Sequence, residues 1–82
     1  MHARINSLLK SVFDVSDREV AQDLTKDDVL KWDSLTHMDL IASIEKEFGI
    51  QLTFDDILAM NSFHKIRLVV TEKVTNYERH AA

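Results

Sequence analysis

The residues whose side chains are best suited to chemistry are Asp33, Ser34 and His37, which lie close together in the sequence. A serine hydroxyl one helical turn from a histidine suggests a nucleophile and its base. No third residue is evident to orient the imidazole, and no oxyanion-hole motif accompanies the pair. A chain of 82 residues is also too short for a deep pocket. We therefore expect no hydrolase, and no enzyme.

Metal chemistry is not expected either. The absence of cysteine excludes disulfides and thiolate metal sites, and it fits a reducing compartment. The histidines lack the spacing of a zinc site, and a loop rich in aspartate lacks the glycine and spacing of a calcium loop. These residues, predicted to be solvated, are His2, His37, His64, His80, Asp23, Asp27 and Asp28.

Helices must position Ser34, because the chain has a single glycine and no proline for the tight turns of sheets. Apolar residues at helical spacing predict a first helix over about 3–14. The second helix begins at Asp33-Ser34, both good N-cap residues, and ends at Gly49, which suits a left-handed cap. Its broad apolar face comprises Leu35, Met38, Ile41, Ala42, Ile44 and Phe48.

Two further helices complete the predicted fold. Thr53 and Asp56 have the spacing of a capping pair and open a short helix through about Met60. Asn61-Ser62 then caps a last helix. Residues 15–32 show weak periodicity and are predicted to be a long loop that packs across the bundle. Trp32 either packs this loop against the bundle or lies exposed, and packing is expected. The chain is therefore expected to be one all-α domain over 1–82, a four-helix bundle with its core at about 3–77.

Ser34 stands where a helix start can assist chemistry. Its hydroxyl points outward beside backbone N–H groups that lack intrahelical partners. The positive end of the helix dipole favours an attached phosphate. Taken alone, a serine before a helix is most often only an N-cap, and that alternative is weighed against the motif around it.

The run Trp-Asp-Ser-Leu-Thr-His-Met-Asp-Leu-Ile-Ala-Ser-Ile-Glu-Lys-Glu-Phe-Gly-Ile over 32–50 resembles the Asp-Ser-Leu segment and second helix of acyl carrier proteins. The resemblance covers about 29–74 well. Asp-Ser-Leu alone is a weak tripeptide, but the distance to Glu-Lys-Glu-Phe-Gly-Ile in a short helical chain makes it specific. The chain departs from the family pattern at Lys31-Trp32, which replace a frequent glycine, and at Thr36 and Lys46, which replace acids.

The resemblance implies a carrier that is not itself an enzyme. A phosphopantetheinyl transferase would move 4'-phosphopantetheine from coenzyme A onto Ser34, with Asp33 helping the transferase's Mg²⁺ site. The thiol of this arm would carry acyl intermediates as thioesters between enzymes of fatty-acid, polyketide or other specialised biosynthesis. An aminoacyl, peptidyl or D-alanyl carrier, and an unmodified interaction module, stay open as alternatives.

The resemblance also implies a docking face for partner enzymes on the second helix. Its apolar contact positions are Leu35, Met38 and Ala42, and its acidic positions are Asp39 and Glu45. Residues 33–56 hold Lys46 against six acidic residues, a net charge of −5. Such a surface repels nucleic acid and attracts basic patches of proteins. We expect a monomer that binds no nucleic acid.

Two further expectations concern location and cargo. No apolar run approaches the length of a membrane span, and the stretch after Arg4 is amphipathic, unlike a signal peptide, so a cytoplasmic location without membrane insertion is expected. One apolar set could line a cavity for a fatty chain or fill the core, and core filling is expected because small interiors are close-packed. This set is Met38, Ile44, Ile57, Leu58 and Ile66.

Overall fold

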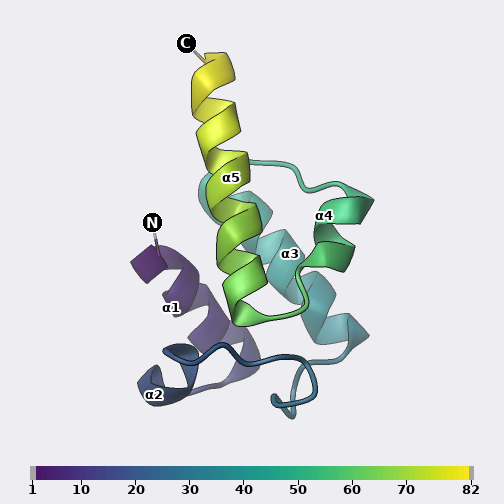
Figure 1. Cartoon of the computed structure of the whole chain (residues 1–82). Helices are drawn as coiled ribbons and strands as arrows, with labels where there is room; N and C mark the ends of the chain where they lie inside the picture. The colour runs from purple at the N-terminus through teal and green to yellow at the C-terminus, as the bar shows by residue number, and fades with distance from the viewer. Residues whose placement is uncertain (1, 82) are drawn as a thin grey trace.

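Helices make up the regular structure of the described part of the chain, as expected for an all-α fold. The computed structural model describes residues 2–81, with side chains described for 2–78. Its helices are α1 His2–Phe13, α2 Asp17–Val20, α3 Ser34–Phe48, α4 Phe54–Ala59 and α5 Phe63–Ala81. In Figure 1, α1, α3 and α5 form the body of the bundle, and the short α4 lies to the right of α5.

Local capping explains why the two helices around the site begin and end where the sequence predicted. The Asp33 carboxylate accepts a hydrogen bond from the Thr36 backbone N–H at 2.8 Å and starts α3. Gly49 ends α3 with φ 64°, a left-handed conformation that suits glycine. Thr53 and Asp56 form a reciprocal capping box at the start of α4.

The prediction of a continuous loop between the first two long helices missed one helical turn. Ser16 and Glu19 form a capping box, with the Ser16 hydroxyl accepting from the Glu19 N–H at 3.2 Å, and this starts α2. The turn ends after four residues, so it leaves too few apolar positions for a periodic signal. Its Val20 is buried, which explains why the turn docks on the bundle.

The rest of this connection is tied to the start of α5. The Phe63 N–H donates to the Leu24 carbonyl at 2.9 Å, and the Asp23 carboxylate accepts from the His64 N–H at 2.9 Å. Arg67 donates to the Val20 carbonyl and to Asn6 of α1. The connection therefore has a fixed path, as its predicted packing requires.

The core is apolar and includes an aromatic cluster next to the functional region. The Trp32 ring lies 4.7 Å from that of Phe13 and 5.7 Å from that of Phe63, centroid to centroid. Trp32 is 5% exposed, which confirms its predicted packing role. Residues buried around the cluster on α1, α3 and α5 include Ile5, Leu9, Leu40, Ile41, Ile44, Ile66 and Val70. This cluster fixes the chain immediately before Ser34.

Candidate functional site

Ser34 is the first residue of α3 and is exposed to solvent. Both Asp33 and Ser34 were predicted as possible caps, and the structure gives the cap to Asp33. The alternative that Ser34 serves only as an N-cap is therefore wrong. Its side chain stands in the first turn of a 15-residue helix, where the backbone N–H groups and the helix dipole favour negative charge.

The Asp33 carboxylate is ionised and held in place beside this hydroxyl. Its hydrogen bond from the Thr36 backbone N–H stabilises the charged form and holds the pKa of Asp33 below its ordinary value of 3.8. Asp33 therefore offers a fixed negative charge next to Ser34 near neutral pH.

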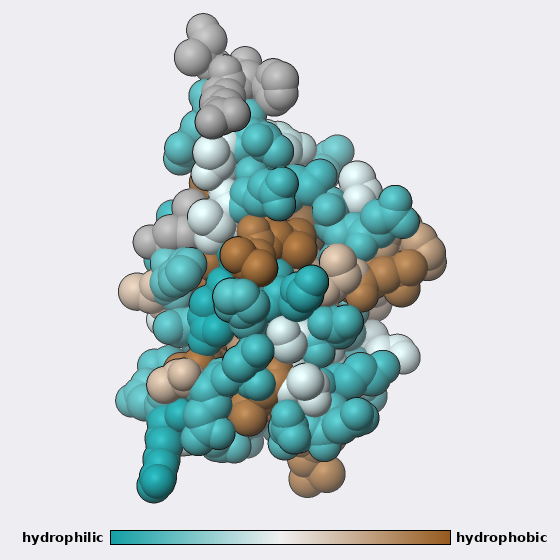
Figure 2. All heavy atoms as spheres, in the orientation of Figure 1, coloured by the Kyte–Doolittle hydropathy of each residue, from teal (hydrophilic) through white to brown (hydrophobic). Residues whose placement is uncertain are grey.

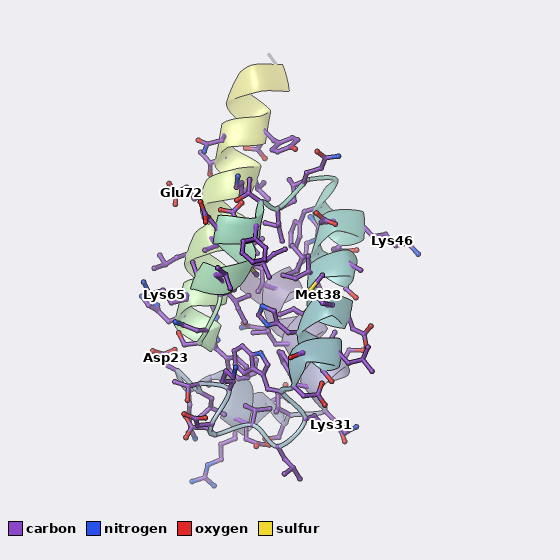
Figure 3. The ribbon with its side chains drawn as sticks, turned by 90° about the vertical axis from the view of Figure 1, so that its right-hand side faces the viewer. Asp23, Lys31, Met38, Lys46, Lys65 and Glu72 are labelled. Atoms are coloured by element: carbon purple, nitrogen blue, oxygen red, sulfur yellow. The ribbon has the colours of Figure 1, made fainter. Side chains whose placement is uncertain are left out.

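An open cleft of about 290 Å³ runs beside Ser34 between α3 and α4. Its residues come from the loop before α3, from one side of α3, and from α4 and the residues that follow it. They are Lys26, Trp32, Asp33, Ser34, His37, Met38, Ile57, Leu58, Met60 and Asn61. Figure 3 shows Met38 on the side of α3 that faces α4, whereas Lys46 points away from the body. The cleft thus joins an exposed hydroxyl to an apolar surface.

His37 lies in this cleft and is not the solvated imidazole that the sequence led us to expect. Its Nδ1 lies 2.9 Å from Nε1 of Trp32, and its Nε2 lies 3.0 Å from the Ile57 carbonyl oxygen. Indole N–H can only donate, so Nδ1 accepts and Nε2 carries the hydrogen that bonds Ile57. Both ring nitrogens are occupied, so His37 is not placed to act as a base toward Ser34.

The predicted docking residues divide into two groups. Leu35 is 76% exposed and Met38 is 51% exposed, and Asp39 and Ala42 are also exposed. Glu45 is half-buried, and its carboxylate accepts a hydrogen bond from the Leu52 N–H at 2.9 Å. The Glu45 carboxylate is therefore bonded to the segment that follows α3, unlike the other predicted docking residues, which are exposed.

Exposed apolar residues on α4 were not singled out for this surface. Phe54 is 73% exposed and Leu58 is 62% exposed. In Figure 2, apolar surface gathers at the right-hand edge, over α4. Thr53 and Asp56 predicted the start of α4, but no sequence pattern indicated how α4 packs against α3.

Lys26 was also missed as a residue of the cleft. The Asp28 carboxylate accepts from the Thr25 N–H at 2.9 Å, and the Asp28 N–H donates to the Thr25 carbonyl at 2.9 Å. These bonds close a tight turn that displays Lys26. The Thr-x-x-Asp spacing signals such a turn, but it does not tell which side of the bundle the lysine faces.

The five apolar residues that, from the sequence, could line a cavity or fill the core do not all take the same position in the structure. Ile44 and Ile66 are fully buried, which confirms that they fill the core. Met38 and Leu58 are exposed and line the open cleft instead, so the core-filling prediction was wrong for these two. Ile57 also lines the cleft, but it is partly buried and packs against the core. A helix face that is partly core and partly surface explains the error, because periodicity alone does not locate its border.

The described residues offer neither a cluster of metal ligands nor a membrane-spanning helix. They contain no cluster of three or more histidine or acidic side chains that could hold a metal ion. None of the helices in this part of the chain is long and apolar enough to cross a membrane.

Comparison with known proteins identifies the family. The family described as "Phosphopantetheine attachment site" matches residues 3–66. No curated protein sequence matches the chain. Domains of this family are the site of covalent 4'-phosphopantetheine attachment and are not catalytic themselves. Because the match covers well over half of the 82 residues, the chain belongs to the phosphopantetheine-attachment family and is a phosphopantetheine carrier protein with an acyl-carrier-like all-α fold.

Proposed function

We propose that Ser34 accepts the 4'-phosphopantetheine arm and that the chain is an acyl carrier protein. The observation that carries this proposal is an exposed serine hydroxyl at the first turn of α3, beside an apolar cleft. Asp33 is the N-cap of α3, so helix capping does not account for the presence of a serine at position 34. The resemblance of the surrounding segment to carrier proteins points to the same residue.

The residues around Ser34 suit the group that would be attached. The helix start favours the phosphodiester, and Lys26 adds a positive charge at the edge of the same cleft. The arm's thiol supplies thioester chemistry when it is bound. Asp33 is fixed beside the acceptor hydroxyl, where it suits the Mg²⁺ site of a transferase. The fold places this hydroxyl in the first turn of α3 and leaves it open to solvent.

The groups next to Ser34 are poor bases for this transfer, which supports a role as substrate of a transferase. The lowered pKa of Asp33 makes its carboxylate a weak base. Both nitrogens of the nearest imidazole, that of His37, are occupied by Trp32 and by the Ile57 carbonyl. The proton of the Ser34 hydroxyl must therefore leave to a group of the transferase.

The apolar lining of the cleft favours an acyl cargo over an aminoacyl one. Met38, Ile57 and Leu58 offer hydrocarbon contacts next to the attachment point. An aminoacyl group carries an ammonium, which these three side chains cannot accept. The acceptors in the cleft lining include Asp33, already bonded to the Thr36 N–H, and Asn61. Weighing the thioester purified from the native host identifies the cargo.

Partner enzymes would dock on the exposed face beside Ser34. This face offers Leu35, Met38 and Ala42 for apolar contact and Asp39 for pairing with a basic patch. Charge complementarity speeds encounter more than it adds affinity, which suits a carrier that must leave each enzyme. Glu45 adds charge to this face but is engaged with Leu52. The carrier is proposed to act in the cytoplasm as a monomer.

Intact-mass spectrometry tests the attachment. Wild-type protein incubated with coenzyme A, Mg²⁺ and a broad-specificity phosphopantetheinyl transferase is expected to gain one phosphopantetheine. S34A is expected to gain none, whereas S11A, a matched change of an exposed helical serine, gains one as wild type does. No gain in the wild type, or an equal gain in S34A, would reject Ser34 as the site.

S34A also separates a carrier from an unmodified interaction module. A carrier loses function in cells when Ser34 is replaced, although the fold is kept. Full function of S34A in a host that depends on the protein would favour the module, because only the module works without the arm.

A further inference from the structure

The cleft beside Ser34 ends against an inner wall. Trp32 and Met60 line the cleft and are also buried members of the core, at 5% and 0% exposure. The Trp32 ring packs between the cleft and the core residue Phe63. Any chain that passed from the cleft into the bundle would have to displace this wall.

His37 contacts the Trp32 part of this wall and also bonds α4. Its ring lies parallel to Trp32, with centroids 6.1 Å apart and planes 14° apart, and accepts the Trp32 N–H. Its other nitrogen donates to the Ile57 carbonyl of α4. The imidazole thus connects the loop before α3, α3 itself and α4 at one point.

The Ile57 contact matters because α4 is short and no residue of it is fully buried, although the Ile57 side chain packs partly against the core. The helix contains six residues. An ion pair from Asp56 to Lys73 of α5, at 2.9 Å, holds its side away from the cleft. On the side of the cleft, the hydrogen bond from His37 ties α4 to α3. Loss of this bond would free α4 to move away from α3.

We propose that His37 closes the passage from the cleft to the core. This inference rests on the proposed attachment at Ser34. With His37 in place, the arm and its cargo lie on the surface of the cleft, and a long acyl chain finds no interior to enter. The carrier then presents its thioester to solvent and to partner enzymes regardless of chain length.

Thioester accessibility measures this directly. A transferase that accepts acyl-coenzyme A loads wild type, H37A and H37Q with acetyl, octanoyl or hexadecanoyl arms, and mass spectrometry confirms each load. Hydroxylamine then cleaves the thioesters. In wild type the three cleavage rates are expected to agree within about twofold, because every cargo stays at the surface.

The variants identify the group responsible. In H37A the octanoyl thioester is expected to be cleaved about tenfold more slowly than the acetyl one, as the chain enters the bundle for most of the time. H37Q has one acceptor and one donor, so it is expected to restore the wild-type pattern. Fluorescence of Trp32, the single tryptophan, is expected to change with octanoyl loading in H37A and not in wild type.

Several outcomes overturn the proposal. Protection of the octanoyl thioester in wild type means that the passage is open with His37 in place. Equal rates for all chains in H37A, or strong protection in H37Q, mean that the hydrogen bonds of His37 do not close it. W32F is a second variant that loses the N–H donor and keeps an aromatic ring, so the test does not depend on the folding of H37A. Arm attachment with no effect of His37 rejects only this inference, whereas no attachment at Ser34 rejects both.

Discussion

Replacing Trp32 by phenylalanine removes the indole N–H that donates to His37 Nδ1 at 2.9 Å. The phenyl ring still packs against Phe13 and Phe63, so the cost of full truncation, about 3–5 kcal/mol, is not incurred. The lost bond leaves an acceptor of the half-buried His37 without its donor, which costs about 1–3 kcal/mol. For a domain of this size, the melting temperature should then fall by about 4–24 °C.

A double-mutant cycle separates the hydrogen bond from simple loss of packing. Urea unfolding is measured for wild type, W32F, H37L and the double variant. Because each single change breaks the same bond, the double variant should be more stable than the sum of the single effects predicts, by about 0.5–3 kcal/mol. Y77F is the matched control. It removes an exposed hydroxyl that accepts from the Gln51 backbone N–H at 3.1 Å and should change stability by no more than about 0.5 kcal/mol.

Two results would refute this reasoning. If W32F unfolds within about 0.5 kcal/mol of wild type, the Trp32–His37 bond makes no measurable contribution to stability. If the effects of W32F and H37L simply add, the two residues act independently, and His37 does not stabilise the wall of the cleft through Trp32.

Two further predictions concern the ends of α3. G49A should lower the free energy of unfolding by about 1–2 kcal/mol, measured in urea, because φ is 64° there while no atom lies within 4 Å of the added Cβ; unchanged stability would contradict a left-handed cap. The second prediction concerns Asp33, whose pKa is lowered by the hydrogen bond from the Thr36 N–H. The ionised carboxylate therefore contributes its full stabilisation of the fold above the ordinary pKa of 3.8, and this contribution is lost as the pH falls through the lower pKa of the folded state. D33N keeps a capping side chain that does not titrate, so its urea midpoint should fall less than that of wild type between pH 5 and pH 2, and identical acid curves would argue against this role.

The helix ends near the site were predictable because they depend on neighbouring residues. Asp33 caps α3, Gly49 ends it, and Thr53 with Asp56 starts α4, each through contacts within a few positions. The same local chemistry could have revealed α2, whose Ser16 and Glu19 have capping-box spacing. Its four residues gave no periodic pattern to support that signal.

The surface and core sides of α3 were harder to predict. Its apolar residues surround much of the helix, so the pattern included exposed Leu35 and Met38 with buried Ile41 and Ile44 and left out the fully buried Leu40. Periodicity identifies a helix face only where polar residues border it. On this helix, the packing of α1 and the rest of the core determines which apolar residues face solvent.

The sequence by itself determined the helical class, the position of Ser34 at a helix start and the acidic character of the segment that follows. These properties depend on composition, on caps and on a motif, all of which are local. Only the tertiary structure decided that His37 bonds Trp32 and Ile57, and that α3 and α4 enclose a cleft beside Ser34. The Ile57 carbonyl lies 20 positions from His37 in the chain, and their contact depends on how α4 packs against α3, which no local pattern encodes.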